Sequence, residues 1–401
     1  MPSVAHLDEQ MARWGQEWAA DEYLARHEHC QDYFEALRQS TERYYSSRVY
    51  TPCPSVTFEK ILGEMLALSH WMTPSPWGDT LRQLVCGNAP PCLLFPGAED
   101  HGPAIALRCQ LGYLLENLAE YMRSCSRQLD TTSESFREYS AIFQSLRRSF
   151  DVGIFNLNYD TAALAAMPGA YTGFDNDGKF EPGVVHARAE WDYVYHLHGS
   201  VHHSLIGPNI DQICWRNDLA GEFFDTDRGI GPKLRSEGRL FPTTTLLAGG
   251  FKLDQLLMEP FHSYHAALVR HVYAADAILI GGYGFGDAHV NRALSNRIAS
   301  TGVRPPVIIL GQRPIRTLLA ASDHWAADFC MTMGTNLSFF HDVDRTPSSP
   351  SREIPRRGSF EVAKEQRIAL WDGGFVESAS QVDWIVAWLR GEINHVLRTA
   401  P

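Results

Sequence analysis

The sequence predicts an α/β fold built on a doubly wound parallel sheet, with a mainly helical part before it. Up to about residue 150, apolar residues recur at spacings of three and four, the period of a helix with one buried face. Beyond residue 150, short apolar runs alternate with helical segments. Strands that are separated by helices pair in parallel, so we expect the sheet core over residues 151–344.

Three helical stripes are expected within residues 1–150. A stretch rich in Pro and Gly, residues 74–103, separates the first stripe from the other two and predicts a solvent-facing loop or a flap over a site. The stripes consist of Phe58, Ile61, Leu62 and Met65; of Leu111, Leu114, Leu115, Leu118 and Met122; and of Phe136, Tyr139, Phe143, Leu146 and Phe150.

Five apolar runs predict the strands of the core. They cover residues 151–155, 191–198, 243–248, 277–280 and 307–310.

Helices are expected at residues 253–273, with an interruption at Pro260, and at residues 290–299. The last part of the chain, residues 345–401, is expected to be a flexible arm followed by a helix. The arm is rich in Pro, Ser and Arg over residues 345–359, and the helix is expected over residues 381–397.

Composition and charge exclude several classes of protein. The chain has 401 residues, of which 44% are hydrophobic, enough to bury a large core. Its 35 Lys and Arg against 47 Asp and Glu give a net charge of −12, which disfavours direct binding to nucleic acid. No run approaches the roughly 20 apolar residues that span a bilayer, and the first residues lack a secretory pattern. We therefore expect a cytoplasmic protein without membrane contact.

The eight cysteines indicate neither disulfides nor a structural zinc site. They form no CxxC pair and no spacing typical of zinc ligands. We therefore expect no metal ligands in this chain.

Three short motifs follow predicted strands. The first is an Asn-rich turn that contains Asn158, the second is a Leu-His-Gly-Ser segment with His198, and the third is a glycine turn over residues 281–287. Side chains just past the carboxyl ends of parallel strands converge on the crevice where open α/β sheets bind ligands. An amide, an imidazole and a glycine turn are thus expected to share one nucleotide-sized cleft.

Taken together, the three motifs resemble the sirtuin-like domain of prokaryotic antiviral NAD hydrolases. The order and spacing of the three motifs carry the likeness, the third of them as the string Gly-Tyr-x-Phe-x-Asp-x-His-x-Asn over residues 282–291, and residues 55–62 and 249–260 agree with it. The resemblance covers most of residues 1–315. It implies a Rossmann-like NAD-binding core over residues 151–344, and NAD as the substrate.

The resemblance implies that Asn158 and His198 are the catalytic pair. Chemistry supports the same choice, because cleaving the bond between nicotinamide and ribose develops oxocarbenium character. Such a site needs a polar group that orients water or the ribose, and a base that works near neutral pH. Asn158 can do the first and His198 the second. The alternative for His198 is a hydrogen-bonded core residue, and His196 is expected to pack behind it.

Six further residues are implied to bind NAD, each with a structural alternative. The aspartates can bind ribose hydroxyls or cap helices. The glycines can admit a ligand close to the backbone, or can serve only the tight turn. Family members usually carry Ser in place of Gly284, so one hydroxyl contact to the ligand is lost in this chain. His289 is expected to have a structural role. The six residues are Asp160, Gly282, Tyr283, Gly284, Asp287 and Asn291.

The front of the chain departs from the family pattern. Sirtuin-like domains open with a strand and a Gly-Ala-Gly-x-Ser loop that holds the pyrophosphate, whereas this chain begins with Pro2-Ser3-Val4, just after that point. One hypothesis is that the working protein starts about 20 to 30 residues earlier, the length of a strand and a loop. The other is a degenerate domain that binds nucleotide poorly or not at all.

Three classes of function follow from these observations. The first is an NAD glycohydrolase that depletes NAD upon phage infection of a bacterium. The second is a sirtuin-type protein deacylase, which the lack of zinc cysteines disfavours. The third is a catalytically impaired subunit that binds NAD or ADP-ribose, or that serves as a scaffold in a defence complex. Relatives of similar layout form ring-like oligomers with a DNA-translocating ATPase, so a homo-oligomer and such a partner are expected.

Overall fold

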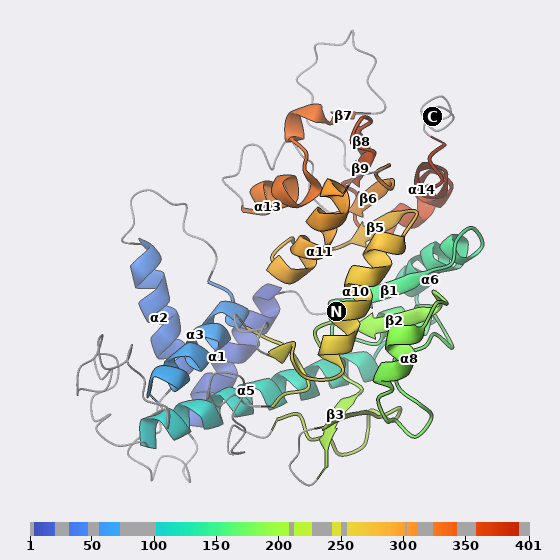
Figure 1. Ribbon diagram of the computed structural model, residues 1–401. Helices are drawn as coiled ribbons and strands as arrows, with labels where there is room; N and C mark the ends of the chain where they lie inside the picture. Colours follow the sequence, from blue (N-terminus) through green and yellow to red (C-terminus); the bar gives the residue numbers. More distant parts are fainter. Residues whose placement is uncertain are drawn as a thin grey trace.

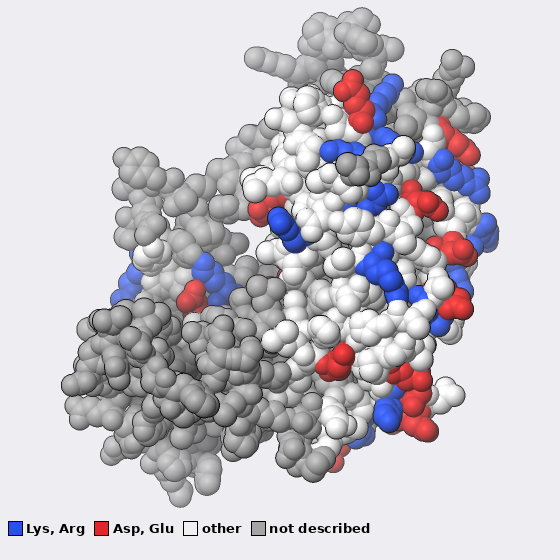
Figure 2. All heavy atoms as spheres, viewed as in Figure 1, with Lys and Arg blue, Asp and Glu red and all other residues white. Residues whose placement is uncertain are grey.

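The computed structural model describes residues 4–20, 32–46, 56–72, 102–207, 212–226, 243–249, 255–300, 303–311, 324–342 and 358–392. Within these residues a helical part lies beside a mixed α/β part (Figure 1). None of the described helices is long and apolar enough to cross a bilayer. On the face shown in Figure 2, acidic and basic side chains of the described residues are interspersed and form no single patch of one sign.

Within the described residues, four helices form the helical part. They are α1 (Val4–Ala20), α2 (Tyr33–Ser46), α3 (Phe58–Met72) and α5 (Gly102–Arg127). The predicted stripes of α3 and α5 are confirmed, because their residues are buried in one cluster that also contains Met11 and Phe34. Helix α6 (Glu134–Arg147) buries the end of the third stripe, Phe143 and Leu146, against the α/β part. Residues 74–101, most of the predicted flap, lie outside the described residues.

The strands of the α/β part form three sheets. Strands β1 (Gly153–Asn156) and β2 (Tyr193–His196) pair in parallel, and β3 (His203–Ile206) and β4 (Gln212–Trp215) form an antiparallel pair. The third sheet has the order β5-β6-β9-β8-β7. Its strands β5, β6 and β9 are parallel, whereas β8 and β7 are antiparallel to their neighbours. These five strands span Ile278–Gly281, Val307–Leu310, Ile368–Trp371, Phe360–Ala363 and His341–Asp342.

Helices alternate with the strands along the chain. Short helices α7 (Ala162–Ala166) and α8 (Pro182–Ala187) lie between β1 and β2 in the sequence. The remaining elements are α10 (Phe261–Ala274), α11 (Ala288–Ala299), α13 (His324–Met333), η1 (Leu337–Phe339), η2 (Glu377–Gln381) and α14 (Val382–Leu389).

The parallel strands were expected in one doubly wound sheet, but the described strands form separate sheets. In Figure 1 the five-stranded sheet is drawn above the β1–β2 pair. Among the described residues, β1 pairs only with β2, and β5 pairs only with β6. The residues of β2 and β6 are all buried, whereas most residues of β1 and β5 are only partly buried. The parallel α/β character is thus confirmed, but the described strands do not form a single continuous sheet.

Four of the five predicted strands are present with slightly shifted bounds, and the fifth is not. Residues 243–248 form isolated bridges, Thr226 with Thr244 and Gly199 with Leu246, in place of a strand. The predicted interruption at Pro260 is confirmed, because α10 begins just after it and proline has no N–H to continue a helical ladder. Residues 253 and 254, where the helix was expected to begin, lie outside the described residues.

The last part of the chain differs most from expectation. Residues 345–401 were expected to form an arm and a helix, but β8 and β9 lie inside the five-stranded sheet. Strand β9 is fully buried between β6 and β8, because all four of its residues are apolar. The predicted helix is present as α14, and it ends at Leu389. Most of the predicted arm, residues 343–357, and residues 393–401 lie outside the described residues.

A buried ion pair joins the helical part to the α/β part. Arg123 of α5 binds Asp225 through two hydrogen bonds of 2.8 and 2.6 Å. Both side chains are almost fully buried, with 3% and 6% exposed. The pair raises the pKa of Arg123 even though burial acts against the charged form. Asp225 also accepts a hydrogen bond from the Thr245 hydroxyl, so the pair reaches the segment that borders His198.

Breaking this ion pair from one side should cost more stability than replacing both partners. We expect Arg123→Met to lower the free energy of unfolding by about 3 to 5 kcal/mol, because the Asp225 carboxylate then stays buried without its partner. The double variant Arg123→Met with Asp225→Leu should lose less. Urea denaturation measures all three values. The exposed pair of Arg147 and Asp192 provides the control, since Arg147→Met should cost less than about 1 kcal/mol. Equal losses in the single and double variants would contradict this interpretation.

Candidate functional site

The site is assembled at the carboxyl ends of β1 and β2. Asn156, the last residue of β1, accepts a hydrogen bond from the Asn158 N–H at 3.0 Å, which holds the turn closed. His196 ends β2, and its Nδ1 lies 3.3 Å from the Asn158 carbonyl oxygen and 3.4 Å from Asn156 Nδ2. Burial lowers the pKa of His196 to about 3, so this imidazole is neutral and serves to join the two strand ends.

His198 lies two residues beyond β2, in a segment that is held on both sides. The Leu247 N–H donates to the His198 carbonyl oxygen at 2.8 Å, and Gly199 forms a bridge with Leu246. Gly199 has a φ of +97°, and a Cβ at this position would overlap the Thr245 carbonyl oxygen. The close passage of residues 245–247 therefore requires glycine beside His198.

The glycine turn after β5 is held by its own side chains. Phe285 has a left-handed φ of 54° and is buried against Tyr283, Trp325 and Phe329. Asn291 donates to the Phe285 carbonyl oxygen at 2.7 Å and accepts a hydrogen bond from the Tyr283 hydroxyl at 2.8 Å. Burial and the nearby Asp287 carboxylate raise the pKa of Tyr283. Asn291 and Tyr283 thus set the shape of this turn.

Gly282 and Gly284 differ in what the fold requires of them. Gly282 has a φ of +63°, a conformation that favours glycine. Gly284 does not have a left-handed φ, and a Cβ there would meet no atom of the described chain within 4 Å. The fold therefore does not require glycine at position 284, and open space lies beside its backbone.

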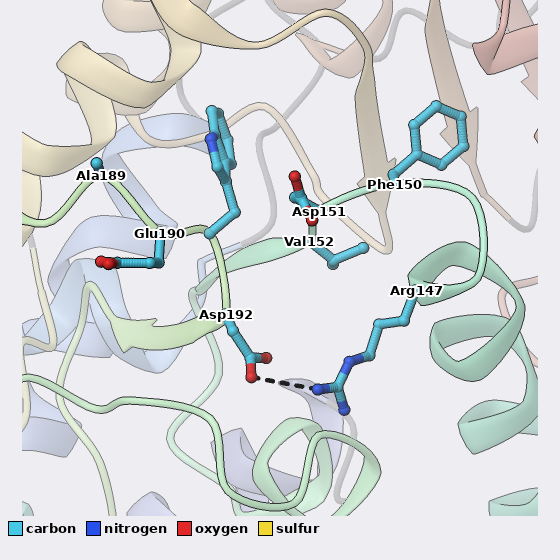
Figure 3. A pocket seen from close by; sticks show the side chains of 8 residues that line it. Arg147, Phe150, Asp151, Val152, Ala189, Glu190 and Asp192 are labelled. Carbon is cyan, nitrogen blue, oxygen red and sulfur yellow. Dashed lines mark hydrogen bonds and ion pairs between the residues drawn. The ribbon is translucent and has the colours of Figure 1, made fainter.

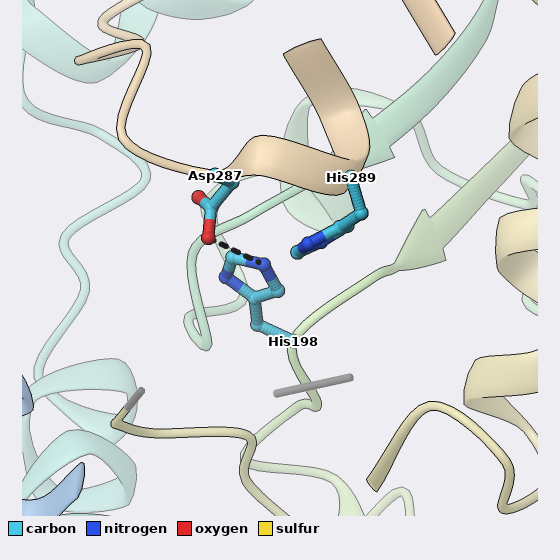
Figure 4. A group of neighbouring side chains, drawn as sticks. All are labelled: His198, Asp287 and His289. Atoms are coloured by element: carbon cyan, nitrogen blue, oxygen red, sulfur yellow. Dashed lines mark ion pairs between the residues drawn. The ribbon is translucent and has the colours of Figure 1, made fainter. Parts of the chain in front are cut away.

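Three side chains meet where β2 and α11 come together. His198 follows β2, and Asp287 and His289 stand at the start of α11; Figure 4 shows the three side chains pointing toward one another. His198 Nε2 lies 3.6 Å from Asp287 Oδ1, and His198 is 3% exposed. Asp287 stands at the N-cap position of α11, but its carboxylate makes no capping hydrogen bond there. It faces His198 instead, where it can stabilise an imidazolium.

A third histidine, which the sequence did not single out, completes this cluster. His265 of α10 has its ring centroid 4.6 Å from that of His289. Burial and the neighbouring His289 lower its pKa to about 3. The predicted motifs each follow a strand, whereas His265 lies in the middle of a helix. Only its position one helical turn after Phe261 could have pointed to a buried face.

The predicted catalytic residues lie at the same sheet edge. The Val201 N–H donates to the Tyr159 carbonyl oxygen at 2.9 Å, which ties the Asn158 turn to the segment that follows His198. Asn158 is exposed, whereas His198 is buried. That the two side chains meet over a substrate stays a prediction.

Asp160 was expected either to bind a ribose hydroxyl or to cap the following helix, and the structure shows a hydrogen bond of the capping kind. Its carboxylate accepts a hydrogen bond from the Ala162 N–H at 2.8 Å, at the start of α7. Asp160 is 4% exposed, and burial raises its pKa. Contact with a ribose hydroxyl stays a prediction.

A separate cavity of about 370 Å³ lies at the opposite end of the same strands. It is lined by residues that precede β1 and β2, among them Arg147 and Asp192, which form an ion pair of 3.2 Å (Figure 3). The other lining residues are Phe150, Asp151, Val152, Ala189, Glu190 and Trp191. This cavity is distant in the fold from the carboxyl strand ends, so it is not part of the candidate site.

One comparison with known families covers the middle of the chain. Residues 152–329 match the SIR2-like domain family. The match begins one residue before β1 and ends within α13, so it contains the Asn158 turn, His198 and the glycine turn. This part of the chain is similar to SIR2-like domains. No curated protein matches the chain.

The glycine beside His198 can be tested for its effect on stability. We expect Gly199→Ala to lower the free energy of unfolding by more than about 2 kcal/mol, because the left-handed backbone alone costs roughly 1 to 2 kcal/mol and the overlap with Thr245 adds to it. Gly169→Ala is the matched control, since Gly169 has a φ of +80° but open space around its Cβ position. Urea denaturation compares the two variants. Equal losses would show that the contact with Thr245 is not tight.

Proposed function

We propose that this chain is an NAD⁺ glycohydrolase that cleaves NAD to nicotinamide and ADP-ribose. The observation that carries the proposal is the convergence of His198 and Asp287 at the carboxyl ends of β2 and β5, inside a SIR2-like domain. SIR2-like domains typically act on NAD. The Asn158 turn lies at the same edge, which supports a shared site for the dinucleotide.

The chemistry requires one bond to break and one to form. The bond between C1′ of the ribose and the nicotinamide nitrogen breaks, and its electron pair leaves with the ring, which becomes neutral. A water oxygen then bonds to C1′ and gives up a proton. His198 Nε2 is the proposed acceptor of that proton, and the Asp287 carboxylate at 3.6 Å stabilises the imidazolium that results. Asn158 is proposed to orient the water or the ribose.

The glycine turn is the proposed binding surface for the dinucleotide. The space beside Gly284 leaves room for a ligand against the backbone. Gly282, two residues earlier in the same turn, is proposed to contribute to this surface. Tyr283 and Asn291 are proposed to act by holding this turn, since both are engaged in hydrogen bonds within it. Asp160 and Asp287 are the proposed partners of ribose hydroxyls.

Hydrolysis of NAD by the purified protein tests the proposal directly. We expect nicotinamide release, measured by chromatography, to fall by roughly 10² to 10⁴-fold in His198→Ala, the usual loss of a general base. Asn158→Ala should also lose most of the activity, because the water or ribose is no longer oriented. The matched controls are His262→Ala and Asn217→Ala, which remove an exposed imidazole and an exposed amide elsewhere.

Other outcomes of this assay have distinct meanings. Retained NAD binding with no turnover would replace the hydrolase with an NAD-binding or ADP-ribose-binding subunit. Nicotinamide release that depends on an acyl-lysine peptide would replace it with a deacylase.

Gly284→Ala separates binding from folding. We expect its melting temperature to be unchanged, because the added methyl group meets nothing within 4 Å. Its affinity for NAD should fall by about tenfold, since the methyl group occupies the space proposed for the ligand. Calorimetric titration with NAD measures the affinity. Gly183→Ala, which also adds a methyl group in open space, should leave the NAD affinity unchanged. Unaltered NAD affinity in Gly284→Ala would move the binding surface away from this turn.

The biological role that we propose is depletion of NAD in bacterial anti-phage defence. A hydrolase that ran freely would harm its host, so an off state is part of the proposal. Assembly into a homo-oligomer, with a DNA-translocating ATPase as partner, is one proposed means of control, and it is expected to raise a low basal rate of the isolated protein. Equal rates of NAD hydrolysis in the isolated protein and in the assembled complex would contradict it.

A further inference from the structure

The cluster at the candidate site has a donor set that is typical of metal ions. One ligand atom from each of His198, Asp287 and His289 lies within 4.8 Å of the other two. Two imidazole nitrogens and one carboxylate oxygen suit zinc and its neighbours among the divalent transition metals. The three residues come from two distant segments of the chain, so their meeting is a product of the fold and not of local sequence.

The separation between His198 and Asp287 fits ligands of one ion. Hydrogen bonds between nitrogen and oxygen are about 2.7 to 3.2 Å long, and the 3.6 Å between Nε2 and Oδ1 exceeds this range. Two ligands that each stand about 2.1 Å from a tetrahedral zinc ion are roughly 3.4 Å apart. The observed distance is close to this value, and a rotation of the His289 ring can shorten the remaining separations.

Two features around the cluster support ligand binding. The Asp287 carboxylate is turned toward His198 although it stands at the N-cap of α11, where a capping hydrogen bond is the usual arrangement. Behind His289, the buried Nε2 of His265 has no hydrogen-bond partner among the described residues. A second imidazole next to a ligand histidine can orient it or enter the coordination sphere.

We propose that His198, Asp287 and His289 form a binding site for a divalent transition metal ion, with Zn²⁺ as the physiological occupant. Three protein ligands leave a fourth position open to water. A zinc ion there occupies the lone pair of His198 Nε2, so that imidazole cannot accept a proton while the metal is bound. Zinc therefore acts as an inhibitor that switches the hydrolase off; this consequence rests on the proposed function, whereas binding of the metal does not.

Cobalt binding tests the site without reference to activity. Metal-free protein, prepared with a chelator and desalted, is titrated with Co²⁺ and followed by its visible d–d absorption. We expect saturation at one ion per chain and competition by Zn²⁺. His289→Ala and Asp287→Asn should each weaken Co²⁺ binding by at least tenfold, because even loss of an outer partner costs about 10- to 100-fold in metal affinity. His262→Ala, an exposed histidine on the same helix as His265, should not change the affinity.

X-ray absorption of the zinc-loaded wild-type protein gives an independent answer that needs no variant. We expect only nitrogen and oxygen ligands at about 2.0 to 2.2 Å. A zinc–sulfur distance of about 2.3 Å would assign the metal to cysteines and overturn the proposal. Absence of saturable Co²⁺ binding, or binding that His289→Ala leaves intact, would overturn it as well.

The inhibitory role is tested by the ratio of NAD hydrolysis rates without and with Zn²⁺. We expect at least a tenfold ratio in the wild type and a ratio near one in His289→Ala. Metal-free protein that does not hydrolyse NAD would refute the proposed function and leave the metal site standing. Hydrolysis that continues unchanged in zinc-saturated protein would refute inhibition.

Discussion

The position of His198 depends on a line of buried polar contacts that starts in the helical part of the chain. Arg123 of α5 binds Asp225, Asp225 accepts a hydrogen bond from Thr245, and the Thr245 carbonyl oxygen presses against Gly199. A buried carboxylate requires a partner, and that partner is on a helix more than 70 residues before His198 in the chain. The helical part is therefore more than a cover, because it fixes the backbone of the segment that carries the imidazole.

The sequence predicted those parts of the fold in which one local signal dominates. The helical stripes of α3 and α5 have a clear period, and the apolar runs at β1, β2, β5 and β6 are bounded by turn residues. It did not predict β8 and β9, because the Pro- and Ser-rich stretch that precedes them dominates the composition of this part of the chain. It also predicted a strand at residues 243–248, where Thr244 and Thr245 form side-chain and bridge contacts in place of a ladder.

For the site, the sequence indicated the three motifs because each comes directly after an apolar run that predicts a strand. The side chains that contact His198 could not be predicted, since their positions depend on tertiary packing. Asp287 was expected to bind ribose or to cap α11, yet its carboxylate is directed at His198. His289 was expected to be structural, and His265 was not singled out at all. A helix start that gives up its capping hydrogen bond breaks a local rule, and such breaks tend to mark functional sites.

The candidate site is divided between two sheets that do not share a hydrogen bond among the described strands. His198 is attached to the β1–β2 pair, whereas Asp287 and His289 are attached to the five-stranded sheet through β5 and α11. A molecule that contacts both His198 and Asp287 therefore links the β1–β2 pair to the five-stranded sheet. Because such a molecule binds only the folded protein, its binding raises the free energy of unfolding of both sheets together.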